Sequence, residues 1–215
     1  IICSDGHTKY EVIEDRFFEY EHNIFEKIHN IKRQIDSFEK LEKFEKDIND
    51  LENKITLFHA KIGKEFIEEK KIDIIGFHGQ TIYHSPKEKI SKQLGQGKLL
   101  SQLLEKKVVY NFRQNDIRNG GEGAPLAPLF HKLIASKLKF SLPSCILNIG
   151  GISNFTIIEN NDLSKFFSKD IGPGNCLIDN WIRNNSSKKF DINGKLASKG
   201  MINEIILEQG QELFS

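Results

Sequence analysis

The chain has 215 residues, of which 31 are basic and 30 acidic, so its formal net charge is +1 with histidine neutral. A charge so close to zero provides no overall basic field to hold a nucleic acid or a membrane surface. The three cysteines, Cys3, Cys145 and Cys176, are far apart and odd in number, which indicates neither a disulfide framework nor a metal-ligand spacing. They favour a reducing, cytoplasmic setting, and no signal peptide or membrane-length apolar run is evident.

The first 70 residues predict two kinds of structure. Residues 8–20 mix β-branched, aromatic and charged side chains, which predicts two strands joined near Glu14 and Asp15. From Asn23 to Lys70 apolar residues recur every three or four positions, at Ile28, Ile31, Ile35, Phe38, Leu41, Phe44, Ile48, Leu51, Ile55, Phe58, Ile62 and Phe66. We expect an antiparallel helix pair packed on a sheet, with a break near 47–50; a free coiled coil is the alternative.

Strands alternate with helices in the remaining sequence, which predicts an α/β sheet. We expect buried strands in 72–81 and 106–112, helices at 99–105, 128–139 and 177–184, two strands in 144–160 around a Gly-Gly turn, and a helix over 201–214. A change of unit near Ser141–Pro143 divides the chain into a first lobe, 1–142, and the start of a second, 143–215.

Two glycine-bearing segments follow predicted strands in the first lobe. In Gly76–Thr81, Gln80 and Thr81 can hydrogen-bond sugar hydroxyls, because ligands of α/β sheets bind beyond the carboxyl ends of strands. Spacing alone favours a structural role for His78. After the next strand, Arg113 offers a fork of donors for a carboxylate or phosphate, and a glycine-rich loop follows Asp116. The plainer reading is a surface loop in which Arg113 and Asp116 pair.

Two more such segments lie in the second lobe. The run from Asn148 through Gly150 and Gly151 to Asn154 can surround phosphate oxygens with backbone N–H groups, or it can be an ordinary hairpin. In 170–175, a rigid Gly-Pro-Gly turn precedes a helix N-terminus, which favours an anion. Asp170, just before this turn, can accept a proton from water, or it can hold the turn through bonds to the backbone.

Together the four segments are typical of a site for phosphate and a polyhydroxyl ligand. The sequences FHGQTIYH, NFRQNDIRNGGEGAPLAPLFH, LNIGGISNFT and DIGPGNCLIDNW, and SKQLGQGKLLSQ between the first two, resemble the ordered motifs of anhydro-N-acetylmuramic acid kinases. The resemblance runs from about Ile72 to Gly200. It implies the actin, hexokinase and heat-shock ATPase fold, with two ribonuclease H-like lobes around a nucleotide cleft.

The resemblance also implies a reaction and its residues. Mg-ATP would be the donor, and a 1,6-anhydro-N-acetylmuramic acid ring would be opened by water and phosphorylated on O6 during cell-wall recycling. Asp170 would be the catalytic base. The anhydrosugar would be held by Thr81, Gln80, Arg113 and, less certainly, Asp116. The phosphates and the floor beside Asp170 would be formed by Asn148, Gly150, Gly151, Asn154, Gly172, Gly174 and Asn175. No protein metal ligands are implied.

The chain departs from the family in three places. A Gly-Thr-Ser phosphate loop near the N-terminus and a glycine-rich adenosine-binding region near the C-terminus are missing, and Ile171 replaces a threonine. We therefore expect a fragment of an enzyme that is weak or inactive by itself. The alternatives are a non-catalytic anhydrosugar-binding protein and another sugar kinase of the same superfamily. A homodimer is an open option.

Overall fold

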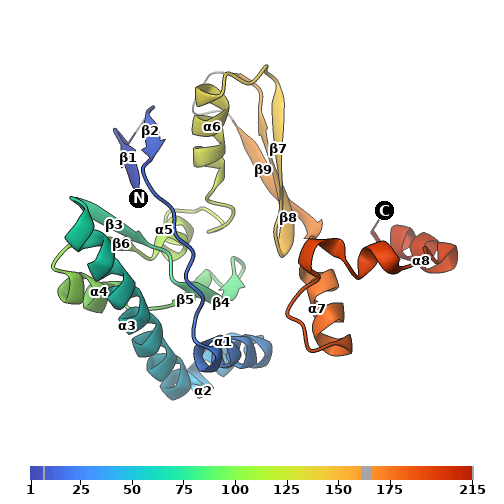
Figure 1. The fold of residues 1–215 in the computed structure, drawn as a ribbon, viewed down its shortest axis with the longest axis horizontal. Coiled ribbons are helices and arrows are strands. Elements are labelled where there is room, and N and C mark those ends of the chain that lie inside the picture. The colour runs from blue at the N-terminus through green and yellow to red at the C-terminus, as the bar shows by residue number, and fades with distance from the viewer. Residues whose placement is uncertain (7, 161–165, 215) are drawn as a thin grey trace. The chain divides into compact units, whose positions relative to one another are not determined.

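The computed structural model describes residues 1–6, 8–160 and 166–214, and these form two compact units, Ile1–Leu126 and Ala127–Ser215 (Figure 1). Each unit combines helices with small sheets, so the chain belongs to the mixed α/β class. The division falls before the helix that begins at Pro128, whereas the sequence places that helix in the first lobe. The assignment of residues 1–142 and 143–215 to two lobes stays a prediction.

The first unit opens with a short hairpin of β1 (Ile2–Ser4) and β2 (Tyr10–Val12), in which Ile2 lies opposite Val12. Its turn is held by Asp5, whose carboxylate accepts hydrogen bonds from the backbone N–H groups of Thr8 and Lys9, both at 2.9 Å. The prediction of two strands joined near residues 14 and 15 is therefore wrong. The turn lies earlier, because the Asp5 side chain organises it locally.

Three helices follow: α1 (His22–Gln34), α2 (Phe38–Lys43) and α3 (Glu45–Glu69). The main break lies at residues 35–37, where Ser37 is extended, and not at 47–50 as predicted. The charges at 47–50 belong to the exposed face of α3, where Asp50 contacts Lys54 at 2.7 Å and Lys27 of α1 at 3.5 Å. Charged residues near a predicted break therefore marked solvent exposure and not a turn.

The two long helices run in opposite directions and pack on a sheet, as predicted. The ring centres of Tyr20, just before α1, and Phe58 of α3 are 4.9 Å apart. Lys27, further along α1, contacts Asp50, which lies earlier in α3, so the two helices are antiparallel. Helix α1 also contacts β4, and α3 contacts β5. The core of the unit is apolar and consists of Ile24, Ile28, Ile31, Ile35, Ile48, Leu51, Ile55, Ala60, Phe77, Ile82, Leu94, Leu100 and Leu104. The free coiled coil is therefore excluded.

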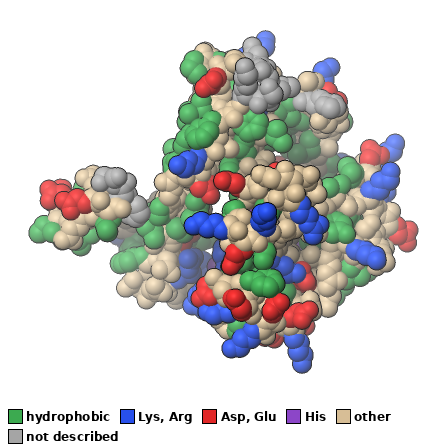
Figure 2. Space-filling model, turned by 180° about the vertical axis from the view of Figure 1, so that it is seen from behind, with side chains coloured by type: hydrophobic (Ala, Val, Ile, Leu, Met, Phe, Trp, Pro, Cys, Tyr) green, Lys and Arg blue, Asp and Glu red, His purple; other side chains and the backbone are tan. Residues whose placement is uncertain are grey.

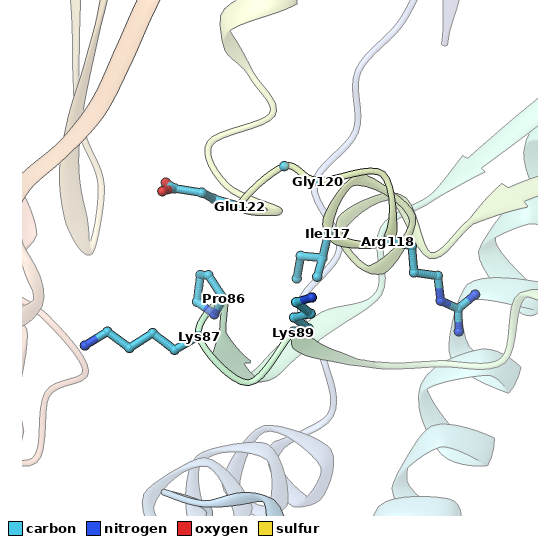
Figure 3. A pocket seen from close by; sticks show the side chains of 8 residues that line it. Pro86, Lys87, Lys89, Ile117, Arg118, Gly120 and Glu122 are labelled. Carbon is cyan, nitrogen blue, oxygen red and sulfur yellow. The ribbon is translucent and has the colours of Figure 1, made fainter.

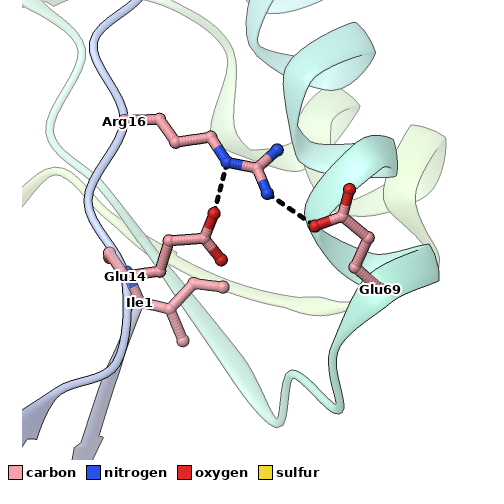
Figure 4. Close-up of polar contacts among 4 residues, drawn as sticks. All are labelled: Ile1, Glu14, Arg16 and Glu69. Atoms are coloured by element: carbon pink, nitrogen blue, oxygen red, sulfur yellow. Dashed lines mark hydrogen bonds and ion pairs between the residues drawn. The ribbon is translucent and has the colours of Figure 1, made fainter.

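The segment between the first hairpin and α1 is tied to the end of α3 by Arg16 (Figure 4). Its guanidinium pairs with Glu14 and, through Nη2, with Glu69 Oε2 at 2.6 Å. The same guanidinium lies 4.8 Å from the centre of the Phe66 ring. An ion pair and a cation–π contact thus anchor an otherwise extended segment to α3.

Two small sheets carry the first unit's candidate site. Strands β3 (Ile74–Phe77) and β6 (Lys107–Tyr110) are parallel, with Phe77 opposite Tyr110, and α4 (Gly97–Leu104) precedes β6. Strands β4 (Gln80–Ser85) and β5 (Ile90–Leu94) form an antiparallel hairpin, and α5 (Phe112–Arg118) follows β6. Both predicted strands and the helix are present. The β6 strand is less buried than predicted, since Val109 is 43% exposed.

The second unit contains α6 (Pro128–Lys137) and a three-stranded antiparallel sheet of β7 (Ser144–Ile149), β8 (Ile152–Ile158) and β9 (Phe167–Pro173). Helix α7 (Cys176–Asn185), two short 3-10 turns, η1 (Ile192–Gly194) and η2 (Ala197–Lys199), and helix α8 (Glu204–Phe214) follow. The predicted hairpin and helices are confirmed. Strand β9 was not predicted.

Helix α6 packs on one face of this sheet, where His131 Nδ1 lies 2.8 Å from Thr156 Oγ1 and Thr156 and Ile158 are buried. On the face shown in Figure 2, basic and acidic side chains are interspersed. None of the helices within the described ranges is long and apolar enough to cross a membrane.

Candidate functional site

The carboxyl ends of β3 and β6 bring together the first two predicted segments. Because the two strands are parallel neighbours, His78, directly after β3, and Arg113, in the first turn of α5, start from the same edge of the sheet. The Nε of Arg113 donates to Nε2 of His78 at 2.9 Å, and its Nη1 donates to the carbonyl of Gly123 at 2.9 Å. The guanidinium is therefore fixed by two different segments.

Asp116 shapes the glycine-rich loop that follows α5. Its Oδ2 accepts a hydrogen bond from the Gly123 N–H at 2.8 Å, and its backbone carbonyl accepts one from Gly121 N–H at 2.9 Å. A Cβ on Gly121 would lie 2.1 Å from Asp116 Oδ2, so the loop can approach this carboxylate only with glycine there. These contacts give Asp116 a structural role in holding the loop that carries the acceptor for Arg113.

Gln80 and Thr81 begin β4, one residue beyond the turn at His78 and Gly79. Both are half-buried, and the Thr81 hydroxyl accepts a hydrogen bond from Gln93 Nε2 at 3.4 Å. Gly79 has φ +68°, and a Cβ there would lie 2.3 Å from the carbonyl oxygen of Leu94. This turn therefore requires glycine, and the β4 strand that follows it pairs with β5 in a separate sheet from β3 and β6.

A pocket of about 640 Å³ lies between the β4–β5 turn and the end of α5 (Figure 3). It is lined by Pro86, Lys87, Lys89, Ile117, Arg118, Gly120, Gly121 and Glu122. Lys87 and Arg118 point in opposite directions away from Ile117 in this view, so the basic side chains do not converge on one point. The pocket shares its glycines with the loop that Asp116 holds, but Thr81 and Arg113 do not line it.

In the second unit, the sheet register places three predicted residues in one row. Asn148 of β7 lies opposite Asn154 of β8, and Asn154 lies opposite Asp170 of β9. Directly opposed residues project to the same face with Cβ atoms about 4.5–5.5 Å apart, so the two amides and the carboxylate form one polar row. Asp170 therefore lies within a strand and not before a turn, contrary to the sequence prediction.

A β-bulge adjoins this row. Ser153 pairs with Gly172 and Asn154 pairs with Asp170, so Ile171 is an extra residue on β9. Asp170 is exposed, and in the described part of the chain its carboxylate makes no hydrogen bond or ion pair. The plainer reading, in which Asp170 holds a turn through backbone bonds, therefore finds no support in its contacts.

The Gly-Gly turn and the Gly-Pro-Gly segment pack directly on each other. The N–H groups of Gly174 and Asn175 donate to the carbonyls of Gly151 and Gly150 at 2.9 and 2.7 Å, and the Asn175 side chain donates to the Ile149 carbonyl at 3.1 Å. A Cβ on Gly174 would lie 2.3 Å from the Gly150 carbonyl oxygen. These bonds fix the backbone of the segment that follows Asp170. They also occupy N–H groups at the start of α7, where the sequence analysis predicted that an anion would bind.

Comparison with known proteins identifies the family of this chain. The model of the family "Anhydro-N-acetylmuramic acid kinase" matches residues 2–213. The chain belongs to this family. It is 52% identical over 219 aligned positions to an anhydro-N-acetylmuramic acid kinase of Pelagibacter ubique, covering 100% of this chain and 58% of that protein. It is 43% identical over 164 positions to the Agrobacterium fabrum protein of the same name, covering 73% of this chain and 43% of that protein.

The chain spans about half the length of the curated anhydro-N-acetylmuramic acid kinases that it matches. The family match confirms the resemblance inferred from the four motifs. The contacts of Gln93 with Thr81 and of Gly123 with Arg113 emerge only from the structure.

In residues 1–6, 8–160 and 166–214, no three His, Cys, Asp or Glu side chains gather where they could hold one ion. Asp170 has two asparagines beside it in its row and no second carboxylate. The described residues therefore do not form a Mg²⁺ site by themselves.

Proposed function

We propose that this chain is part of an ATP-dependent kinase that opens 1,6-anhydro-N-acetylmuramic acid with water and phosphorylates O6. The product is N-acetylmuramic acid 6-phosphate, an intermediate of cell-wall recycling in the cytoplasm. The two compact units are proposed to belong to the two lobes of an actin- and hexokinase-like fold. Membership of a kinase family supports ATP as the donor. Mg²⁺ would accompany ATP, and a homodimer is one possible assembly.

One observation carries the proposal: the exposed Asp170 carboxylate stands in a row with Asn154 and Asn148, beside the Gly-Gly turn. A carboxylate without a protein partner remains able to accept a proton from a bound water. The neighbouring amides can donate to ligand oxygens without adding charge. Gly151 has nothing within 4 Å of the position where a Cβ would lie, so its backbone is open to an approaching phosphate.

The proposed reaction couples hydrolytic opening of the anhydro ring to phosphoryl transfer. Asp170 takes a proton from water, the water oxygen bonds to the anomeric carbon, and the bond between that carbon and O6 breaks. The electron pair left on O6 attacks the γ-phosphorus of ATP, and ADP leaves. Asp170 then returns its proton to solvent. In this scheme Asn148, Gly150, Gly151 and Asn154 line the phosphates, and Gly172, Gly174 and Asn175 form the floor.

The first unit would hold the sugar. Arg113 can bind a carboxylate in two parallel hydrogen bonds, which suits the lactyl group of the anhydrosugar. Gln80 and Thr81 can bond its hydroxyls. Asp116 contributes by holding the Gly121–Gly123 loop, and a direct contact with the sugar is not needed for that role.

The test is ADP release by the complete polypeptide that contains this sequence, measured with 1,6-anhydro-N-acetylmuramic acid, N-acetylmuramic acid and glucose in parallel. We expect turnover with the anhydrosugar and little with the other two. Turnover with glucose or N-acetylmuramic acid instead would identify another sugar kinase. Binding of the anhydrosugar without ADP release would identify a non-catalytic binding protein. Either outcome would refute the proposal.

A further inference from the structure

His78 joins the two strand ends of the first unit, although its spacing in the sequence gave no functional signal. It follows β3, and its Nδ1 lies 2.8 Å from the carbonyl oxygen of Gly79 while its Nε2 lies 2.9 Å from Nε of Arg113. These two contacts lie on opposite sides of one imidazole ring. His78 therefore connects the backbone of the β3–β4 turn to the guanidinium at the start of α5.

The chemistry of the two partners determines where the ring carries its proton. A carbonyl oxygen only accepts hydrogen bonds, so Nδ1 of His78 must carry a hydrogen to bond Gly79. The Nε of Arg113 only donates, so Nε2 of His78 must present a lone pair. Both bonds exist together only when the imidazole is neutral with its proton on Nδ1. A positively charged imidazole would direct an N–H at the N–H of Arg113.

The same contacts restrict the orientation of the Arg113 guanidinium. Nε of Arg113 is held by His78 and Nη1 by the Gly123 carbonyl, and these acceptors come from different loops. Because each guanidinium N–H donates within the plane of the group, two acceptors from different loops restrain that plane, and the plane decides the direction from which a carboxylate can form two parallel hydrogen bonds. The turn that carries His78 is itself fixed, because Gly79 has φ +68° and no room for a Cβ.

We propose that His78 is a positioning residue for carboxylate recognition: the neutral ring, protonated on Nδ1, sets the plane in which Arg113 binds the carboxylate of the anhydrosugar. Only the identity of that carboxylate rests on the proposed function. His78 touches Arg113 and not the reacting atoms, so its loss should weaken binding of substrates that carry the carboxylate and leave other sugars unaffected.

The first test needs no ligand. In the complete protein with ¹⁵N-labelled histidine, the His78 ring should show a protonated Nδ1 and a bare Nε2 at about pH 8. Assignment comes from the spectrum of His78→Gln, in which these signals disappear. A proton on Nε2 instead would overturn the proposal, because Arg113 could then not donate to that atom.

The second test measures binding of two ligands, 1,6-anhydro-N-acetylmuramic acid and 1,6-anhydro-N-acetylglucosamine, which lacks the lactyl carboxylate. We expect His78→Leu to weaken binding of the first roughly tenfold and to leave the second unchanged, as for residues coupled by direct contact. His78→Gln, whose amide oxygen can accept from Arg113 at the former Nε2 position, should restore most of the loss. Equal binding of the carboxylate ligand by parent and His78→Leu would refute the positioning role.

Arg113→Gln separates this proposal from the proposed function. If that variant binds 1,6-anhydro-N-acetylmuramic acid as the parent does, Arg113 does not read the carboxylate and the assignment made under the proposed function fails. If Arg113→Gln binds weakly, the double variant with His78→Leu should bind no more weakly than Arg113→Gln alone. Additive losses in the double variant would show that His78 acts independently of Arg113 and would overturn the positioning role.

Discussion

Asn154 and Asp170 lie directly opposite each other on β8 and β9, immediately beside the bulge at Ile171. The bulge increases the local twist of β9 at the point where the strand turns into the Gly-Pro-Gly segment. Bulges of this kind are common next to active sites, where they redirect a side chain. The proposed chemistry depends on this placement of an asparagine opposite a carboxylate that makes no hydrogen bond or ion pair within the described residues.

Asp170→Asn should abolish most turnover and leave the fold intact. A positioned general base contributes about 10²–10⁴-fold in rate, so the rate of ADP release should fall by about that factor. Because Asp170 is exposed and its side chain has no partner in the described residues, the free energy of unfolding should change by less than about 0.5 kcal/mol.

The matched control for this variant is Glu159→Gln, which removes an exposed carboxylate just after β8. It should keep both activity and stability. Full activity of Asp170→Asn would remove Asp170 from the role of base, and equal losses in the two variants would indicate a general effect of charge.

Gly79→Ala should destabilise the first unit. The new Cβ would meet the Leu94 carbonyl oxygen at 2.3 Å in a backbone with φ +68°, and together collision and strain should cost about 1–3 kcal/mol in the free energy of unfolding. Denaturant unfolding of the purified protein measures this loss.

Gly120→Ala separates collision from backbone strain. Gly120 also has a positive φ, +91°, but a Cβ there meets nothing within 4 Å. Its substitution should therefore cost less than that of Gly79, about 1 kcal/mol. A loss for Gly79→Ala no larger than that for Gly120→Ala would show that the turn relaxes around the added carbon.

The sequence predicted the helix pair, the strands β3 and β6 and the helix α4 of the first unit, but neither the β4–β5 hairpin nor α5. Apolar runs ending at Phe77 and Tyr110 indicated two strands whose carboxyl ends carry polar residues, and those strands are parallel neighbours. The helix break was misplaced because the apolar repeat continues through Ile35 and Phe38 across the true break. The repeat reports which side is buried, and it does not report whether the backbone is continuous.

Asp170 illustrates what the sequence did not determine in the second unit. The Gly-Pro-Gly segment predicts a turn, so the sequence places Asp170 just before a turn. The sequence does not predict the strand β9, in which Asp170 lies. Strand β9 exists because it pairs along the whole of β8, from Ile157 to Ile152, and such pairing depends on residues distant in sequence. Local preferences identified the residue as important but could not place it opposite Asn154.

Lys92→Met should destabilise the first unit more than its partly exposed position suggests. Lys92 Nζ contacts Glu52 Oε1 at 2.8 Å, and the Glu52 side chain is only 8% exposed, so loss of the cation leaves a buried carboxylate on α3 without this partner. We expect a loss of about 1–3 kcal/mol in the free energy of unfolding, measured with denaturant.

Lys54→Met is the matched control, since it breaks an ion pair of similar length, 2.7 Å to Asp50, on the exposed side of the same helix. It should cost less than about 0.5 kcal/mol. Similar losses in the two lysine variants would contradict the importance of burial for the pair between Lys92 and Glu52.

The stability of the first unit should fall as the pH falls through the range in which histidine titrates. His59 is held neutral among Tyr20, Phe58 and Phe77, with Nδ1 2.8 Å from the Ile55 carbonyl. Burial lowers the pKa of His59 below its ordinary value of 6.5. The unfolded chain therefore binds a proton at a higher pH than the folded one, so the unfolding free energy is lower below about pH 6.5 and recovers above it.

His59→Gln should flatten this dependence, because the amide can be buried without gaining a charge as the pH falls. The measurement is urea unfolding at about pH 5 and pH 8, with protection of the α3 amides from hydrogen exchange as a local readout. Burial also lowers the pKa of His131 in the second unit, so its contribution has the same sign and persists in the variant. His22→Gln, at an exposed position on α1, serves as the control. A pH dependence of α3 protection that is unchanged in His59→Gln would show that the buried ring is not its cause.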